Sequence, residues 1–391
     1  MKKVRAEAAW TAGTGRGVTI AIVDSGVDPF HEDLQANMVA GYDFVDKDSD
    51  PRDEAGHGTH VAGIAAAVAN NGLGVAGVAP SAKIMPVRVL DADGSGSLRD
   101  IEEGVRWAVM HGADVVNLSL SSDFFTEFLT GGTLTDAVNF AWSHGVIAVV
   151  SAGNDQLFRS ELRKAKAILV TATTPDDRKA SYATGVGFAP WGMAAPGGTN
   201  EGGQANMIFS TWWAADGKRY AYAMGTSMAA PHVAGAAALL RGMGLSPQQT
   251  VDRLLNTAKD LGSRGRDNTF GHGRLDVAAA TQAGSDGAAG QDGSSAAGAS
   301  ATGKPGASAS GTRGAPGERF VRRGGGVTTA EPTDEPTPSV TPSRTRRPPL
   351  AQVTDDDGIG AWPFVLAGVG AAAVAGAALL YLRYRRGTAG R

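Results

Sequence analysis

The sequence predicts an α/β fold in which a mostly parallel central sheet carries helices on both faces. Runs rich in β-branched residues alternate with helical runs as far as about residue 280, which is the pattern of a parallel sheet with crossover helices. The first such run, residues 18–23, is almost continuously apolar, which is typical of a strand that is buried on both faces. A domain of this size buries enough surface to fold without disulfides, and the chain has no cysteine.

Each expected element follows from its local pattern along the chain. The strands are short aliphatic runs, and the helices are longer segments in which alanine, leucine and valine recur between polar residues. The expected strands are residues 18–23, 83–90, 115–120, 147–151 and 168–173. The expected helices are residues 60–69, 98–111, 133–144, 232–243 and 247–257. In sheets of this class, functional groups gather outside the carboxyl ends of the strands, where Asp24 and Asn154 fall.

Three small-residue turns carry an aspartate, a histidine and a serine in that order. Asp24 ends the first strand, His57 lies in Gly-His-Gly-Thr-His, and Ser227 lies in Gly-Thr-Ser-Met-Ala-Ala-Pro-His, ahead of an apolar helix. A neutral hydroxyl is a poor nucleophile, so it needs an imidazole to take its proton and a carboxylate to orient the imidazole. The helix N-terminus beside the serine would supply free backbone N–H groups for an oxyanion. Together these residues predict acyl-transfer chemistry.

Each of these residues also has an ordinary structural interpretation. Taken alone, Asp24 would be a turn or cap residue, and Ser227 would cap its helix. The spacing of His57 and His60 does not match His-Glu-x-x-His, which argues against a metal pair. We expect Pro231 within the first turn of its helix, where a missing N–H costs little. The histidines expected to be structural are His60, His232 and His272.

These motifs, from about Trp10 to Ala280, resemble those of the subtilisin-like serine proteases, or subtilases. The resemblance implies the three-layer subtilisin-like fold, peptide-bond hydrolysis by Asp24, His57 and Ser227, and a polypeptide substrate. It implies that Asn154, in Ser-Ala-Gly-Asn-Asp, donates its side-chain amide to the oxyanion. The extended substrate would pair by main-chain hydrogen bonds with two segments, a form of β-augmentation. The substrate-binding residues so implied are Gly94, Ser95, Gly96, Ser119, Leu120, Ser121 and Asp155.

Substrate specificity and metal binding follow less directly from the residues. Ser121 and Ser122 replace the glycines common in subtilases, and Asp155 near the pocket rim would favour a basic residue before the scissile bond. The loop from Asp91 to Gly96, with Glu102, has the spacing of an EF-hand, but a strand is expected before it, so we interpret it as a groove wall. No cofactor is expected for catalysis. Asp33 and residues 70–75 resemble a structural calcium site of subtilisins, which leaves structural calcium as an open expectation.

The chain beyond the peptidase domain, 1–280, changes in composition. Residues 281–357 are rich in Gly, Ser and Ala and then in Thr and Pro, which predicts a flexible linker. Residues 361–382 form an uncharged apolar run, long enough at about 33 Å to span a bilayer, and 383–391 form a basic tail. Acidic residues before the run and arginines after it predict a cytoplasmic C-terminus and an extracellular catalytic domain at the plasma membrane. A buried core helix is the alternative for this run.

The net charge of −3 gives no indication of nucleic-acid binding.

The N-terminus lacks the apolar region of a signal peptide, so we expect the natural precursor to start upstream or this chain to be a processed form.

A peptidase domain, a Pro-rich tether and a C-terminal apolar run ending in arginines resemble the mycosins, subtilases of actinobacterial type VII secretion. That resemblance implies a secretion complex as partner, although mycosins typically carry cysteines and this chain has none. The alternatives are a membrane-tethered scaffold or pseudoprotease and a soluble degradative protease.

Overall fold

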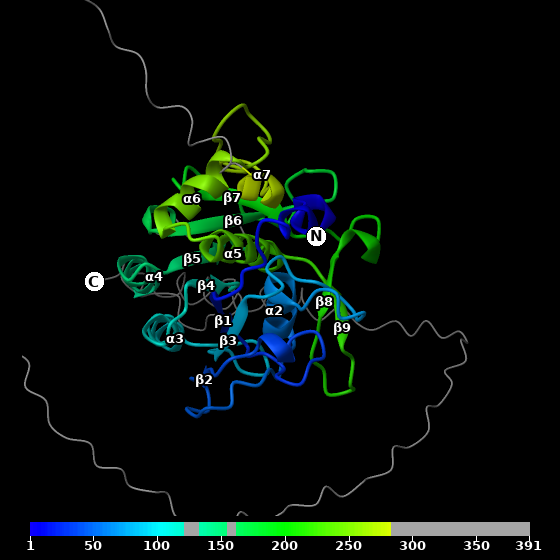
Figure 1. Cartoon of the computed structure of the whole chain (residues 1–391), viewed down its shortest axis with the longest axis vertical. Coiled ribbons are helices and arrows are strands. Elements are labelled where there is room, and N and C mark those ends of the chain that lie inside the picture. Colours follow the sequence, from blue (N-terminus) through cyan, green and yellow to red (C-terminus); the bar gives the residue numbers. More distant parts are fainter. Residues whose placement is uncertain (121–132, 155–161, 283–391) are drawn as a thin grey trace, which may run out of the picture. The chain divides into compact units, whose positions relative to one another are not determined.

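The computed structural model describes residues 1–120, 133–154 and 162–282. Seven strands form one sheet in the order β2-β3-β1-β4-β5-β6-β7, and every neighbouring pair in it is parallel (Figure 1). The parallel sheet expected from the sequence is therefore confirmed. The strands of this sheet are β1 (Thr19–Asp24), β2 (Tyr42–Asp43), β3 (Lys83–Arg88), β4 (Val115–Leu118), β5 (Ile147–Ser151), β6 (Ala167–Thr173) and β7 (Gly192–Pro196).

Helices cover both faces of the sheet. Two buried clusters lie on opposite sides of it, one with α2 and α5 and the other with α3 and α4. The α-helices are α1 (Ala6–Ala9), α2 (His57–Ala66), α3 (Leu98–Met110), α4 (Thr133–Ser143), α5 (Thr226–Gly242), α6 (Pro247–Asn256) and α7 (Val277–Gln282). The 3-10 helices are η1 (Lys2–Val4), η2 (Gln35–Asn37), η4 (Leu162–Lys164) and η5 (Gln204–Asn206).

The two-sided burial of β1 explains its continuous apolar sequence. Ile20 and Ile22 belong to the cluster with α2 and α5, whereas Ala21 and Val23 belong to the cluster with α3 and α4. Successive side chains of a strand point to opposite faces, so both sets must be apolar when both faces are covered. The position of β1 inside the sheet, between β3 and β4, places Asp24 at the carboxyl edge with a strand on either side.

A separate antiparallel hairpin, β8 (Ile208–Thr211) and β9 (Tyr220–Ala223), packs against α2. The hydroxyls of Ser210 and Thr211 donate to the carbonyls of His60 and Thr59 at 2.9 and 2.6 Å. This close packing needs a small residue on α2, because a Cβ at Gly63 would lie 2.2 Å from Thr211 Oγ1. The glycines and alanines of α2 thus allow the hairpin to approach.

Two helices begin earlier than the sequence indicates. The structure starts α2 at His57 rather than residue 60, and α5 at Thr226 rather than residue 232. The expectation that Pro231 lies in the first turn was therefore wrong, because five residues of α5 precede it. The elements that the sequence did not indicate are β2, β7, β8, β9, α1 and α7.

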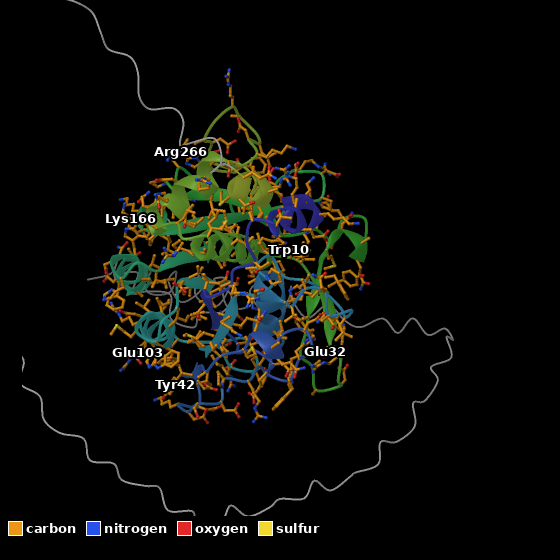
Figure 2. The ribbon with its side chains drawn as sticks, viewed as in Figure 1. Trp10, Glu32, Tyr42, Glu103, Lys166 and Arg266 are labelled. Carbon is orange, nitrogen blue, oxygen red and sulfur yellow. The ribbon has the colours of Figure 1, made fainter. Side chains whose placement is uncertain are left out.

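Many charged side chains project from the surface of the described part. Figure 2 shows Glu103, Lys166 and Arg266 projecting outward from the ribbon. Among the described residues, no helix is long and apolar enough to cross a membrane. The expected linker, apolar span and basic tail lie outside the described residues and stay predictions.

Candidate active site

Asp24 is the last residue of β1 and is fully buried. Its Oδ1 accepts the backbone N–H of Ser25 at 2.8 Å and lies 2.6 Å from Nδ1 of His57. Because an ionised carboxylate only accepts hydrogen bonds, Nδ1 of His57 must carry the proton in this contact. The aspartate therefore fixes both the orientation and the tautomer of the imidazole, leaving Nε2 as the nitrogen that can accept a proton.

His57 is the first residue of α2, and its side chain is 20% exposed. Burial lowers the pKa of the imidazole, but the charge and hydrogen bond of Asp24, with the charge of Asp53, together raise the pKa above its usual value. The preceding Gly56 has φ of 89°, and a Cβ there would lie 2.5 Å from the ring of Trp212. Only glycine fits this entry to α2 without strain.

Asp53 is a buried carboxylate that the sequence did not single out. It accepts hydrogen bonds from the Ser25 and Thr59 hydroxyls and from the N–H groups of Ala55, Gly56 and Thr59, all at 2.6–2.9 Å. Burial raises the pKa of Asp53, while these donors oppose that rise. Asp53 thus caps the N-terminus of α2 and ties it to the end of β1. The only signal in the sequence was an acidic residue just ahead of a helix start.

Ser227 lies in the first turn of α5, where its own backbone N–H has no partner within the helix. The side-chain oxygen of Asn154 accepts hydrogen bonds from the N–H and the hydroxyl of Thr226, each at 3.0 Å. The Thr226 hydroxyl in turn accepts the N–H of Gly153 at 3.1 Å. These bonds join the end of β5 to the start of α5, and they turn the amide nitrogen of Asn154 away from Thr226. Thr226 is a second positioning residue that the sequence did not indicate.

Ser119 has a structural role in addition to the groove position expected for it. Its hydroxyl donates to the backbone carbonyl of Ser227 at 2.8 Å and accepts from the Asn117 amide at 2.8 Å. In a regular helix the N–H of residue 231 would bond to that carbonyl, but Pro231 has no N–H. Ser119 therefore supplies the missing donor to the backbone of Ser227.

The two expected groove segments follow β3 and β4, the strands on either side of β1. The segment from Gly94 to Gly96 lies in a loop after β3, in which Asp91 Oδ1 accepts the N–H groups of Asp93 and Ser95. A helix-flanked EF-hand is excluded here, because a strand precedes the loop. The side chains of Ser119 and Leu120 are buried. The other expected substrate-binding residues, Ser121 and Asp155, lie outside the described residues.

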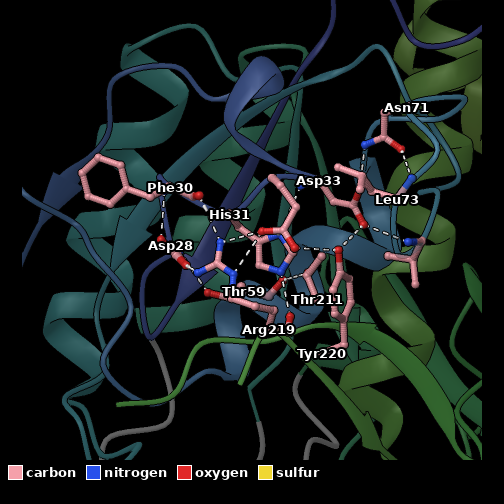
Figure 3. Close-up of polar contacts among 12 residues, drawn as sticks. Asp28, Phe30, His31, Asp33, Thr59, Asn71, Leu73, Thr211, Arg219 and Tyr220 are labelled. Atoms are coloured by element: carbon pink, nitrogen blue, oxygen red, sulfur yellow. Dashed lines mark hydrogen bonds and ion pairs between the residues drawn. The ribbon is translucent and has the colours of Figure 1, made fainter. Parts of the chain in front are cut away.

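The expected calcium position is occupied by hydrogen-bond donors (Figure 3). Asp33 Oδ1 accepts from Asn71 Nδ2 at 2.7 Å, and Oδ2 accepts from Val75 N at 2.8 Å and Tyr220 Oη at 3.1 Å. The amide oxygen of Asn71 is itself turned to the N–H of Leu73. Calcium requires six to eight converging oxygens, so this arrangement does not fit the ion. Within the described ranges no group of three acidic, histidine or cysteine side chains could hold a metal.

Two other histidines near the site are buried. His60 Nε2 lies 3.2 Å from the carbonyls of Ile208 and Ala221, and His232 Nδ1 lies 2.8 Å from that of Met228. Burial, with the nearby His57, lowers the pKa of His60 to about 4. Burial also lowers the pKa of His232 to about 3. Both rings are thus neutral near pH 7 and bonded to backbone, in the structural role expected for them.

Comparison with known proteins gives consistent matches. The model of the Subtilase family matches residues 15–273. Thermitase of Thermoactinomyces vulgaris is 40% identical over 288 residues, 72% of this chain and 94% of that protein. A thermophilic serine proteinase of Bacillus sp. (strain AK1) is 42% identical over 271 residues, 68% of this chain but only 62% of that protein. A solved protease structure from Pseudoalteromonas arctica aligns with a TM-score of 0.61 at 33% identity, covering 72% of this chain and 94% of that chain.

Proposed function

The chain belongs to the subtilase family and is a subtilisin-like serine endopeptidase, and we propose that Asp24, His57 and Ser227 form its catalytic triad. The observation that carries the proposal is the 2.6 Å contact between buried Asp24 and His57, at the strand edge where α5 presents Ser227. A purely structural or scaffold role gives no reason for this buried charged contact at the sheet edge where Ser119, after β4, bonds the backbone carbonyl of Ser227.

The proposed mechanism uses each group at a stated atom. His57 Nε2 takes the proton of Ser227 Oγ as that oxygen attacks the carbonyl carbon of the scissile bond. The resulting oxyanion accepts hydrogen bonds from the Ser227 N–H and the Asn154 Nδ2. His57 then gives its proton to the leaving amine, and the C–N bond breaks to leave an ester on Ser227. Water, deprotonated by His57, hydrolyses that ester and returns the enzyme to its starting state.

Substitution of two of these residues tests the assignment. Ser227→Ala should lower the turnover of a peptide substrate by on the order of 10⁶-fold, because no other group can form the ester. Asn154→Ala should lower it by roughly 10²–10³-fold with little change in KM, because its amide acts on the transition state. Steady-state hydrolysis of a chromogenic peptide measures both. Near-normal turnover of Ser227→Ala would reject Ser227 as the nucleophile.

We also propose the substrate contacts expected from the sequence. The acyl half of the substrate would lie extended between Gly94, Ser95 and Gly96 on one side and Ser119, Leu120 and Ser121 on the other, and Asp155 would favour a basic residue before the scissile bond. The burial of the Ser119 and Leu120 side chains supports a main-chain role for these positions. Cleavage-site profiling of a peptide library with the wild type and Asp155→Asn tests the charge preference.

The proposed location is the outer face of the plasma membrane, with residues 361–382 as a single-pass anchor and 281–357 as the tether. The uncharged apolar run, with acidic residues before it and arginines after it, supports this orientation. The full chain should require detergent for extraction from membranes, whereas a truncated variant ending at Ala280 should not. Release of the full chain by high salt or carbonate would contradict the anchor.

We propose a secretion complex of the type VII kind as partner, because peptidase domain, Pro-rich tether and arginine-flanked apolar run occur together as in the mycosins. Affinity purification of the detergent-solubilised full chain, with Ser227→Ala alongside the wild type, tests this partner. Recovery of secretion components with both forms would support the complex and would separate binding from catalysis.

A further inference from the structure

Two adjacent tryptophans, Trp212 and Trp213, lie against Gly56, the residue before the proposed catalytic histidine. They directly follow β8, and the backbone N–H of Trp212 donates to the carbonyl of Arg219 at 2.6 Å. A Cβ placed on Gly56, the residue before His57, would lie 2.5 Å from Cε2 of Trp212 and 2.5 Å from the carbonyl of Trp213. The Trp212 ring also meets the His60 ring edge-on, with centroids 5.9 Å apart. The pair is thus fixed against the first turn of α2.

Both tryptophans remain partly exposed. Large aromatic side chains that keep solvent exposure at a fixed position beside a reaction centre are typical of recognition surfaces. The packing of Trp212 on Gly56 accounts for one side of its ring, and the exposed part is left to contact something else. Nothing in the proposed triad chemistry requires an indole at this position.

The position of the pair identifies which half of the substrate it would contact. The hairpin lies on the opposite side of α2 from β1 and β3 (Figure 1). The proposed acyl-side groove follows β3 and β4, so it lies on the sheet side of His57. The leaving amine must reach the imidazole that protonates it, and the residue bearing that amine therefore lies beside His57. On the hairpin side, the Trp212 ring and the backbone carbonyl of Trp213 approach Gly56, the residue next to His57.

The two indoles present apolar ring surface. The cation of Arg219, whose carbonyl accepts the Trp212 N–H, is paired with Asp28 at 2.7 Å and with Glu32 at 2.9 Å (Figure 3). An aromatic side chain stacked on indole gains both buried area and ring contact, and a charged side chain would lose hydration without a counter-ion.

We propose that Trp212 and Trp213 form the wall of the pocket for the first residue on the leaving-group side, and that this wall selects large apolar, above all aromatic, side chains. The inference rests on the proposed triad and deepens it. Acyl transfer tests it directly. When an amino-acid amide replaces water, its nitrogen attacks the ester carbon on Ser227, the C–O bond to Ser227 breaks, and His57 carries the amine proton to Oγ. The amide then occupies the position of the leaving residue.

The experiment uses the full chain and one peptide ester, so that the acyl half is constant. The rate of ester hydrolysis is measured, and then the partition of the acyl-enzyme between water and phenylalaninamide or glycinamide. We expect the wild type to favour phenylalaninamide, and Trp213→Ala and Trp212→Ala each to reduce that preference by about threefold to tenfold. Ester hydrolysis is measured for every variant, so that the partition is compared only between variants that form the acyl-enzyme. Trp212→Phe, which keeps an aromatic ring on Gly56, should retain most of the preference.

The matched control is Phe209→Ala, which removes an aromatic side chain, 43% exposed, from the same hairpin. Phe209 contacts Tyr222 and Tyr220 rather than Gly56, so the partition should not change. A wild type that hydrolyses the ester but shows equal partition, or a preference unaffected by both tryptophan variants, would overturn the inference. Absence of ester hydrolysis by the folded wild type would instead count against the proposed function.

Discussion

At the scale of single residues, the site depends on groups that have no direct part in bond making. Asp53 accepts five hydrogen bonds at the start of α2, and its charge adds to that of Asp24 in raising the pKa of His57. Thr226 donates two hydrogen bonds to the side-chain oxygen of Asn154, and this leaves the amide nitrogen of Asn154 pointing away from Thr226. These residues hold the side chains of the proposed site in one geometry, and stabilisation of the transition state depends on such a fixed geometry.

The charge on Asp53 should be visible in the pH dependence of the reaction. His57 acts as a base only when neutral, so kcat/KM falls as the pH drops through the pKa of the imidazole. Asp53→Asn removes a charge that raises this pKa, and the acid limb of the profile should therefore move to lower pH. Asp50→Asn, an exposed acid in the same loop that pairs with Arg52, should leave the limb in place. An unchanged limb in Asp53→Asn would mean that Asp53 acts only as a cap.

The fixation of Asn154 gives a second prediction at this scale. Thr226→Val keeps the shape of the side chain but removes the hydroxyl that bonds Asn154 and Gly153. We expect kcat to fall by roughly tenfold with KM nearly unchanged, because the loss affects only the oxyanion contact. Thr257→Val, which removes a hydroxyl bonded within α6, is the control. A rise in KM with normal kcat would place Thr226 in ground-state binding instead.

At the scale of elements, Pro231 and Ser119 form a compensating pair between α5 and the end of β4. Ser119→Ala should lower the free energy of unfolding by about 1–3 kcal/mol, because the Ser227 carbonyl then has no donor. In a Pro231→Ala background the new N–H can bond that carbonyl, so the same substitution should cost less. Urea unfolding of the four variants, made on Ser227→Ala to prevent self-cleavage, measures the coupling. If the changes in unfolding free energy of the two single variants simply add up in the double variant, the compensation is contradicted.

The elements that the sequence predicted are those whose environment resembles an ordinary buried strand or amphipathic helix. The five expected strands occur within two residues of their expected ends, because two-sided burial makes them apolar throughout. The missed strand β7 contains Gly192 and Pro196 and no β-branched residue. The late start expected for α5 followed from Pro231, which in this fold lies inside the helix. A local pattern could not reveal that Ser119, far away in sequence, compensates for it.

The sequence indicated the reacting residues of the proposed site but not the residues that position them. Asp24 and His57, expected to interact from their motifs alone, lie 2.6 Å apart, because those motifs place each residue at a strand or helix terminus. Asp53 and Thr226 carry no signal of their own, since a capping acid and a helix-start threonine occur throughout proteins. The hydrogen bonds that surround Asp33, at the expected calcium position, were unpredictable for a related reason. One of its oxygens accepts from Tyr220, a residue distant in sequence.

At the scale of the whole described domain, Asp177 joins its two ends. It pairs with Lys3 near the N-terminus at 3.1 Å and with Lys259 and Arg274 towards the C-terminus at 2.9 and 3.1 Å. Burial raises the pKa of Asp177, but these cations outweigh that effect and lower it below its usual value. A lowered pKa gives stability that is present above the unfolded value of about 3.9 and is lost as the pH falls through the folded value.

Asp177→Asn should therefore destabilise the domain at pH 7 by about 1–3 kcal/mol and reduce the loss of stability below pH 4. Thermal unfolding followed across pH 3–7, again on Ser227→Ala, measures both effects. Asp176→Asn is the matched control, because that neighbour is exposed and its ion pair among the described residues is a 3.4 Å contact with Arg178. If the stability of Asp177→Asn falls with pH as steeply as that of the parent, the ion pairs of Asp177 do not contribute to the stability of the domain.

The central claim, that the described geometry activates Ser227, is tested most directly by a fluorophosphonate probe, which reacts with activated serines. The full chain is labelled, digested and analysed by mass spectrometry, with Ser227→Ala in parallel. We predict one adduct, on the peptide that contains Ser227, and none in the variant. An adduct on another serine, or none on folded wild type that is shown to bind peptide, would contradict the account.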